Sequence, residues 1–315
     1  MNTFGRNFRV SVFGESHGEA IGVVVDGVKA GIPLSKEDFL EDISRRKSGA
    51  KGTTPRVEAD EPEILSGVFE GHTTGAPIAV IFRNTNTRSA DYESLRDIPR
   101  PGHADYTASV KWNGFNDPRG GGHFSGRLTL PLVAAGVIAK KQCGFSFEAS
   151  LVEIGGEPDK SKWDALLAET AADGDSIGGI VECRVEGVPA GLGEPFFDSV
   201  ESLISHAVFS IPGVRGVEFG DGFAASRMRG SEHNDCFPLT KNGAGGINGG
   251  ITNGAPIVFR VAFKPTSSIA KAQRTLNLKT GEAADLKVHG RHDVCFALRT
   301  PVIVEAVAAI VLADL

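Results

Sequence analysis

The chain contains little cysteine, with four such residues among 315. Cys143, Cys183, Cys236 and Cys295 lie far apart and form no Cys-x-x-Cys pair. This spacing argues against a zinc site or a disulfide framework, and it fits the reducing conditions of the cytosol. We interpret all four as ordinary thiols and expect no bound metal.

The chain also lacks an excess of positive charge. Its 33 Lys and Arg residues face 39 Asp and Glu residues, which gives a formal net charge of −6. That balance argues against nucleic acid as a general partner, so any anion site must be local. The N-terminus has no apolar run typical of a signal peptide, and the most apolar segment, VIVEAVAAIVL, contains Glu305 and is too short to span a bilayer. We therefore expect a soluble, cytoplasmic protein without a membrane partner.

The common nucleotide and metal motifs are missing. GAGGINGG at 243–250 comes near a dinucleotide fingerprint, but Asn248 stands where the third glycine belongs. No Walker lysine follows either glycine cluster, and no His-Glu-x-x-His motif occurs. HGRHD, which starts at His289, has His-x-x-His spacing without an obvious third ligand. A Rossmann site and a metal site are therefore disfavoured.

Glycine, by contrast, is abundant: 40 residues, clustered at 120–122 and 243–250. Such clusters let the backbone approach a ligand closely. GESHG at 14–18 also places His17 between glycines at the end of a strand-like run. His17 could meet a ligand there, or it could belong to a plain turn.

The apolar pattern predicts an irregular alternation of strands and helices. Ser35 and Asp38 form an expected capping box at the start of one helix, and Asp198 and Glu201 form another. Pro131 is tolerated only in a first helical turn, which puts the start of its helix near 129. A final helix that begins at 300–301 is apolar on nearly all sides, which indicates burial between layers. Strands are expected at 8–13, 21–25, 77–82 and 257–263, and a further helix near 162–171.

The pattern predicts one α+β domain over residues 1–315, because no Pro/Ser-rich linker divides the chain. The stretch from 83 to 106 shows no sustained period, and a loop of that length is usually functional or disordered. It holds four arginines and one histidine, which favours a functional role.

Several His, Arg and Lys side chains are embedded in loop-like, glycine-rich sequence. Arginine in such settings suits a phosphorylated or carboxylated small molecule, because its guanidinium group pairs two oxygens at once. Taken singly, each arginine is more often a solvated surface cation and each histidine a structural residue, so the functional interpretation rests on joint placement. The candidates are His17, Arg45, Arg46, Lys51, His103, Arg119, Arg127, Arg291 and Asp293.

The sequence resembles the chorismate synthase family along nearly its whole length and in family order. The matching segments include FGESHG, RPGHADY, the RGGG turn, IPGVRGVEFGDGF, AGGINGGI, KPTSSI and GRHD. The resemblance implies a β-α-β sandwich in which helices pack between two antiparallel sheets. It also implies a homotetramer, although this chain stops directly after its last helix, where many members carry a tail.

The resemblance implies a carbon–oxygen lyase of the shikimate pathway of aromatic amino acid biosynthesis. The implied reaction is the anti-1,4-elimination of phosphate from 5-enolpyruvylshikimate 3-phosphate to give chorismate. It requires reduced FMN although no net redox change occurs. NADPH serves as the flavin reductant in those members that reduce their own flavin.

The resemblance also implies roles for individual residues. His17 matches the acid that faces the leaving phosphate, His103 the histidine at the reduced flavin, and Asp293 the carboxylate that assists the final deprotonation. Substrate or NADPH anions are matched by Arg45, Arg46, Lys51, Arg119 and Arg127. Flavin contacts are matched by His123, Phe124, Ser125, Pro212, Gly213, Gly249, Lys264, Pro265, Thr266, Ser267, Ser268 and Arg291.

Two segments depart from the family pattern. The common turn GGGRSSAR is GGGHFSGR here, so His123 and Phe124 replace a usual cation and its neighbour. In RRKSGAKG, Lys51 or Gly52 stands where an arginine is usual. Two rival functions follow: a catalytically silent flavin- or phosphosugar-binding protein, and an NAD(P)H:flavin reductase that needs no phosphorylated substrate.

Overall fold

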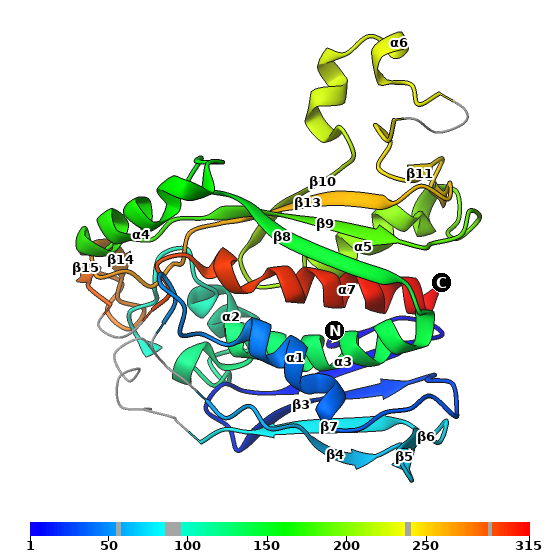
Figure 1. The fold of residues 1–315 in the computed structure, drawn as a ribbon. Coiled ribbons are helices and arrows are strands. Elements are labelled where there is room, and N and C mark those ends of the chain that lie inside the picture. The colour runs from blue at the N-terminus through cyan, green and yellow to red at the C-terminus, as the bar shows by residue number, and fades with distance from the viewer. Residues whose placement is uncertain (55–57, 86–95, 237–240, 289–291) are drawn as a thin grey trace.

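Two antiparallel sheets enclose a layer of helices in the computed structural model (Figure 1). The structure describes residues 1–54, 58–85, 96–236, 241–288 and 292–315. The first sheet has the strand order β1-β2-β3-β7-β4, and the second has the order β10-β13-β9-β8. This arrangement confirms the expected α+β class and the sandwich implied by the resemblance.

The strands of both sheets follow the apolar runs of the sequence. The segments expected at 77–82 and 8–13 appear one residue further along the chain, as β7 and β2. The first sheet comprises β1 (Thr3–Phe4), β2 (Arg9–Gly14), β3 (Ala20–Asp26), β4 (Glu63–Ser66) and β7 (Ile78–Arg83). The second comprises β8 (Ser146–Ile154), β9 (Gly179–Glu186), β10 (Val214–Phe219) and β13 (Ile257–Phe263). Short hairpins are formed by β5 (Val68–Phe69) with β6 (His72–Thr73), β11 (Ile247–Asn248) with β12 (Ile251–Thr252), and β14 (Gln273–Leu276) with β15 (Ala283–Leu286).

Register in the sheets directs the larger apolar side chains toward the helices. In β13, buried residues alternate with more exposed ones along the whole strand, and Val261 pairs with Val181 of β9. In the first sheet, Val10 pairs with Val25 and Val12 with Val23. This period of two is what a sheet with one covered face requires.

Helices α3 and α7 form the middle of the helical layer (Figure 1). The α-helices are α1 (Glu37–Arg46), α2 (Asp105–Lys111), α3 (Thr129–Cys143), α4 (Trp163–Ala172), α5 (Val200–Val208), α6 (Gly230–His233) and α7 (Pro301–Asp314). Short 3₁₀ helices are η3 (Arg119–Phe124), η4 (Gly126–Leu128), η5 (Lys160–Lys162), η6 (Phe196–Asp198), η7 (Gly222–Arg227) and η8 (Phe296–Arg299).

The packing of α3 on α7 explains two features of the sequence. A Cβ at Gly136 would lie 2.3 Å from the Cβ of Ala306, so only glycine permits this approach of the helices. Pro131 sits in the first turn of α3, as expected, and α7 is buried along almost its whole length. Glu305 is buried with the apolar side chains of α7, and its carboxylate is 1% exposed.

The predicted capping box of α1 is half present, and that of α5 is displaced. Helix α1 begins at Glu37, and the backbone N–H of Ser35 donates to the Asp38 carboxylate at 2.7 Å, which is one of the two bonds of the box. Helix α5 is capped by Ser199, whose Oγ accepts from the N–H of Ser202 at 3.1 Å. Asp198 lies in the preceding 3₁₀ turn. Both helices form where expected, but the extended conformation that a cap needs occurs one residue later at α5.

Candidate active site

A cavity of about 1250 Å³ is lined by parts of β2, α1, α3, α5, β10 and α7 together with several loops. This volume exceeds the roughly 300–1000 Å³ typical of a site for one small molecule. The cavity therefore has room for two ligands of moderate size.

The glycine turn of η3 contacts two histidines, of which His103 lines the cavity and His17 packs behind Gly120, a residue of the cavity lining. Gly120 and Gly121 have φ of 60° and 82°, which favours glycine over other residues. A Cβ at Gly120 would lie 2.6 Å from Nε2 of His17, and one at Gly121 would lie 3.3 Å from Cε1 of His103. The two imidazoles therefore contact neighbouring residues of the same turn, although the chain separates them by more than 80 positions.

His103 is fixed by an acidic neighbour. Its Nδ1 lies 2.6 Å from Oδ1 of Asp105, so Nδ1 carries a proton and donates it in a hydrogen bond to that carboxylate. Burial alone would raise the pKa of Asp105, but hydrogen bonds from Arg100 and His103 outweigh it and lower the pKa well below its usual range. Arg100 also donates to Ser268 at 3.1 Å, which connects the RPGHAD and KPTSS segments. His103 is thus oriented by an ionised carboxylate.

The residues that depart from the family turn have defined contacts. His123 lines the cavity, and its Nδ1 donates to the carbonyl of Gly14 at 2.7 Å. Nδ1 therefore carries a proton, and Nε2 faces no requirement from this bond. Phe124 packs on Trp112 with a ring-centroid distance of 5.3 Å. Both replacements are therefore accommodated in the cavity wall.

Asp293 has a partner for each of its carboxylate oxygens. The backbone N–H of Thr54 donates to Oδ1 at 2.8 Å, and Nη2 of Arg299 donates to Oδ2 at 2.7 Å. The Arg299 guanidinium lies 5.3 Å from the ring centroid of Phe296. Asp293, Arg299 and Phe296 all line the cavity. Arg291, predicted at the same site, lies outside the described residues.

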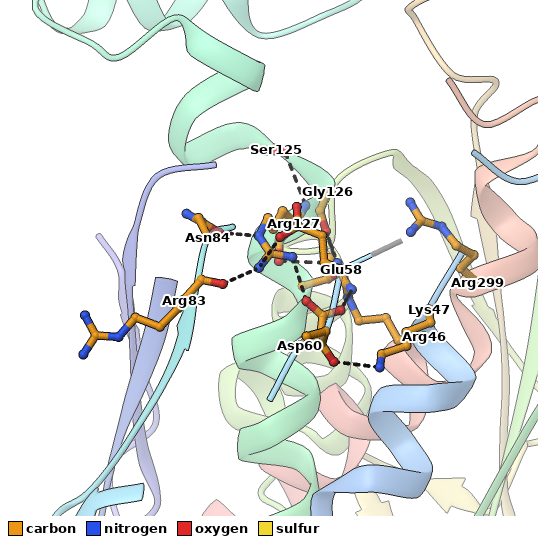
Figure 2. A network of polar contacts seen from close by, with 12 residues as sticks. Arg46, Lys47, Glu58, Asp60, Arg83, Asn84, Ser125, Gly126, Arg127 and Arg299 are labelled. Atoms are coloured by element: carbon orange, nitrogen blue, oxygen red, sulfur yellow. Dashed lines mark hydrogen bonds and ion pairs between the residues drawn. The ribbon is translucent and has the colours of Figure 1, made fainter. Parts of the chain in front are cut away.

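Arg46 and Arg127 line the cavity together with two buried carboxylates (Figure 2). Asp60 lies between the two guanidiniums, and Glu58 lies beside that of Arg127. Asp60 accepts from Nη1 of Arg127 at 2.9 Å and lies 3.5 Å from Nη1 of Arg46. Glu58 lies 3.3 Å from Nη2 of Arg127. Nε of Arg46 donates to Oγ1 of Thr129 at 3.0 Å. Burial, followed by the charge of other arginines, lowers the pKa of Arg46 to about 9.

The KPTSS segment forms another part of the cavity lining. Nζ of Lys264 donates to the carbonyl of Gly102 at 3.0 Å and contacts the hydroxyl of Ser267. Burial, with a smaller contribution from the charge of Arg215, lowers the pKa of Lys264. The cavity lining also includes Ser125, Pro212, Gly213, Pro265, Thr266 and Ser268, all predicted flavin contacts.

Arg45 points away from this cavity. Its guanidinium makes two hydrogen bonds to the Glu305 carboxylate, at 2.8 Å and 2.5 Å, and lies 3.1 Å from Asp42. Lys140 and the backbone N–H of Ala149 also donate to Glu305. Consecutive residues at the end of α1 thus diverge, with Arg45 in an ion-pair network between helices and Arg46 at the cavity.

Four other predicted residues do not line the cavity, and one of them is His17, which packs against Gly120 of the lining. Lys51 pairs with Asp164 at 3.0 Å, and both side chains are more than half exposed. Arg119 is held by Asp117 at 2.8 Å and is 48% exposed. Gly249 forms the turn between β11 and β12 with φ of 62°.

Several polar residues of the cavity carried no predicted role, and four of the charged ones are Glu58, Asp60, Arg100 and Arg299. Arg100 belongs to RPGHAD and could have been selected with His103. Glu58 and Asp60 lie in the run VEADEPE, which is typical of a solvated loop. Arg299 ends η8, directly before the apolar helix α7, and belongs to no motif. The burial of Glu58, Asp60 and Arg299 depends on distant segments and leaves no local signal in the sequence.

The described ranges contain no metal cluster, no membrane-spanning helix and no disulfide. No group of three or more His, Cys, Asp or Glu side chains there could hold a metal ion. None of the helices in this part of the chain has the length and apolarity to cross a membrane. The four cysteines, all within these ranges, form no disulfide there.

Comparisons with known proteins agree on one family. The family model described as chorismate synthase matches residues 8–315. A chorismate synthase of Chitinophaga pinensis is 64% identical over 100% of this chain and 96% of its own length. One of Korarchaeum cryptofilum is 47% identical over 99% of this chain and 96% of its own length.

A solved structure extends this agreement to three dimensions. The crystal structure of a chorismate synthase superimposes with a TM-score of 0.75 at 29% identity and covers 99% of this chain and 92% of that one. The matches in sequence and in structure span almost the whole length of both partners. The chain therefore belongs to the chorismate synthase family of carbon–oxygen lyases.

Proposed function

We propose that this enzyme converts 5-enolpyruvylshikimate 3-phosphate to chorismate by anti-1,4-elimination of phosphate, in the presence of reduced FMN and without net redox change. The reaction belongs to the shikimate pathway. One observation carries the proposal: His103, Arg46, Arg127 and Asp293 line one cavity, and His17 packs against Gly120, which lines the same cavity. An imidazole, cations and a carboxylate in one cavity, with a second imidazole directly behind its lining, suit the loss of a phosphate and a ring proton.

The cavity residues fit a flavin. Ile211, Val214 and Phe296 supply apolar wall for a planar ring, and Lys264 with Ser267 supplies a cation and a hydroxyl for a phosphate. Reduced FMN would lend electron density to the substrate as phosphate departs. The flavin would be held by His123, Phe124, Ser125, Pro212, Gly213, Lys264, Pro265, Thr266, Ser267 and Ser268.

His17 would protonate the leaving phosphate, and Asp293 would assist removal of the ring proton. Asp293 suits a base because Thr54 and Arg299 fix both of its oxygens and so define where the carboxylate stands. His103, oriented by Asp105, would hold or move a proton at its Nε2. The burial of His17, which is 6% exposed, would keep water from competing for its proton.

Arg46 and Arg127 would bind the anionic groups of the substrate. Both guanidiniums are largely buried, at 6% and 8% exposure, so their charge is poorly screened by solvent. The substrate carries a phosphate and carboxylates, and arginine pairs such groups through two parallel N–H donors. Arg119 begins the η3 turn and is held by Asp117, so it would join them only after release from that carboxylate.

Three further properties are proposed from family membership. The enzyme acts in the cytoplasm and assembles as a homotetramer. NADPH reduces the flavin, and NADPH oxidation under anaerobic conditions with oxidised FMN tests this. Absence of oxidation would mean that reduced flavin comes from another source.

An anaerobic assay with chemically reduced FMN tests the main proposal. Phosphate and chorismate should appear in equal amounts, with far less than one flavin consumed per turnover. Tight flavin binding without product would support a silent binding protein instead. Steady NADPH turnover without the phosphorylated substrate would support a flavin reductase.

A further inference from the structure

Asp60 is a buried carboxylate in an unusual backbone conformation. Its φ is 52°, in the left-handed region that residues other than glycine seldom adopt, and it is 5% exposed. Such a conformation persists where surrounding contacts maintain it. At Asp60 those contacts are two arginines that line the cavity.

The two arginines reach Asp60 from different elements (Figure 2). Arg46 ends α1 and lies 3.5 Å from Oδ2, while Arg127 belongs to η4 and lies 2.9 Å from Oδ1. Each oxygen of one carboxylate therefore contacts a different guanidinium. Glu58 supports Arg127 from a second direction at 3.3 Å.

Without Asp60 the two cations would repel each other in a poorly solvated place. Burial lowers the pKa of Arg46 most, followed by the charge of Arg299; the charge of Asp60 raises it, and the charge of Arg127 lowers it further. Arg46 has few other strong partners: Thr129 at 3.0 Å and the carbonyl of Gly126 at 3.3 Å. Asp60 is thus the charged group that keeps Arg46 beside Arg127.

We propose that Asp60 is a positioning residue that joins Arg46 and Arg127 into one anion site for the oxyanions of the substrate. This inference rests on the proposed function and adds to it a residue that does not itself touch the substrate. Because Asp60 carries a negative charge, it would oppose anion binding if it acted through charge alone. Positioning and simple electrostatics therefore predict opposite effects of removing its charge.

Asp60→Asn separates charge from backbone conformation. Asparagine tolerates the left-handed region well, so the chain path should persist. The asparagine amide keeps one oxygen that can accept from Arg127. It presents its NH2 group to Arg46, and the two groups cannot bind because both are donors. Asp60→Gly is the second variant, because glycine relieves the strain and lacks the carboxylate altogether.

Asp42 provides a matched control. It is also a buried aspartate, 9% exposed, and it joins two cations from different helices, Arg45 at 3.1 Å and Lys140 at 2.7 Å. It does not line the cavity. Asp42→Asn should therefore lower the melting temperature but leave the kinetic constants within about twofold of wild type.

The experiment measures kcat, the KM for 5-enolpyruvylshikimate 3-phosphate and the apparent affinity for reduced FMN in the full-length proteins. In both Asp60 variants we expect KM to rise at least about tenfold, with FMN affinity changed by less than about threefold. An unchanged or lower KM in either folded variant would overturn the inference. An equal loss of affinity for the substrate and for reduced FMN would also overturn it. Failure of the proposed function is distinguishable, because wild type itself would then form no chorismate.

Discussion

His17 and His103 contact the same glycine turn but are held differently. His103 has the Asp105 carboxylate 2.6 Å from Nδ1, whereas His17 follows β2 and packs against Gly120 with only 6% exposure. A buried imidazole that contacts the turn has a defined position and little access to water. This difference makes His17 the better candidate for delivering a proton to a leaving group in a water-excluded site.

Replacement of His17 by alanine should lower kcat on the order of 100-fold or more, because a lost general acid typically costs that much. The anaerobic assay with reduced FMN measures it. His72→Ala is the control: His72 is exposed in β6, bonds to the carbonyl of Glu70, and should leave kcat unchanged. A His17→Ala enzyme within threefold of wild type would remove this side chain from the chemistry.

At the scale of elements, the η3 turn offers a matched pair of glycines. Gly120 and Gly144 have φ of 60° and 69°, but a Cβ at Gly120 would meet His17, whereas one at Gly144 would meet nothing within 4 Å. Alanine should cost about 1 kcal/mol of stability at Gly144 because of the left-handed backbone, and more at Gly120, where the added Cβ would also lie 2.6 Å from His17. Only Gly120→Ala should also reduce kcat, by displacing the imidazole. Equal activity of the two variants, measured beside their denaturant unfolding, would contradict this role for the turn.

Helix α7 depends on one buried carboxylate. Burial opposes ionisation of Glu305, but hydrogen bonds from Arg45 and the charge of Lys140 outweigh it and lower its pKa below the usual 4.5. A lowered folded-state pKa stabilises the protein above about pH 4.5, and that stability is lost as the pH falls through the lowered value. Glu305 therefore makes stability increase with pH in the acid range.

Glu305→Gln should lower the free energy of unfolding at pH 7 by about 3 kcal/mol, since it removes one partner of a buried ion pair. The loss should shrink toward acid pH, where wild type also loses the charge. Urea unfolding between pH 3 and 7 measures both effects, with Glu282→Gln in an exposed turn as the control. A pH-independent difference would show that the charge of Glu305 is not what stabilises α7.

At the scale of the whole molecule, two neighbouring aromatic side chains face solvent in the single chain. Phe196 and Phe197 in η6 are 87% and 92% exposed. Adjacent exposed apolar side chains favour a protein–protein contact, which agrees with the proposed tetramer. Mass photometry should find four chains per particle, and Phe197→Ser should shift the distribution toward smaller species. A wild-type monomer at micromolar concentration would refute the proposed assembly.

The sequence predicted most of the fold because local patterns determined it. The apolar alternation of β13, the position of Pro131 and the apolar surface of α7 each constrain a single element, and each prediction was confirmed. The cap of α5 was placed one residue too early, since Asp198 and Ser199 are both good capping residues. Local chemistry could not decide between them.

The candidate site was less predictable because it is assembled from distant segments. Glu58 and Asp60 look like members of a solvated acidic run until the fold places Arg46 and Arg127 against them. Arg45 and Arg46 look equivalent in sequence, yet the direction of each depends on which face of α1 meets α7. Only three-dimensional packing separates a structural cation from one at the cavity.

A crystal structure of the enzyme with FMN and 5-enolpyruvylshikimate 3-phosphate would test the central claim most directly. The account predicts both molecules in the one cavity, with the His17 imidazole within hydrogen-bond distance of the phosphate and the Arg46 and Arg127 guanidiniums on substrate oxygens. Ligands bound elsewhere, or a phosphate remote from His17 with the elimination still proceeding, would contradict it.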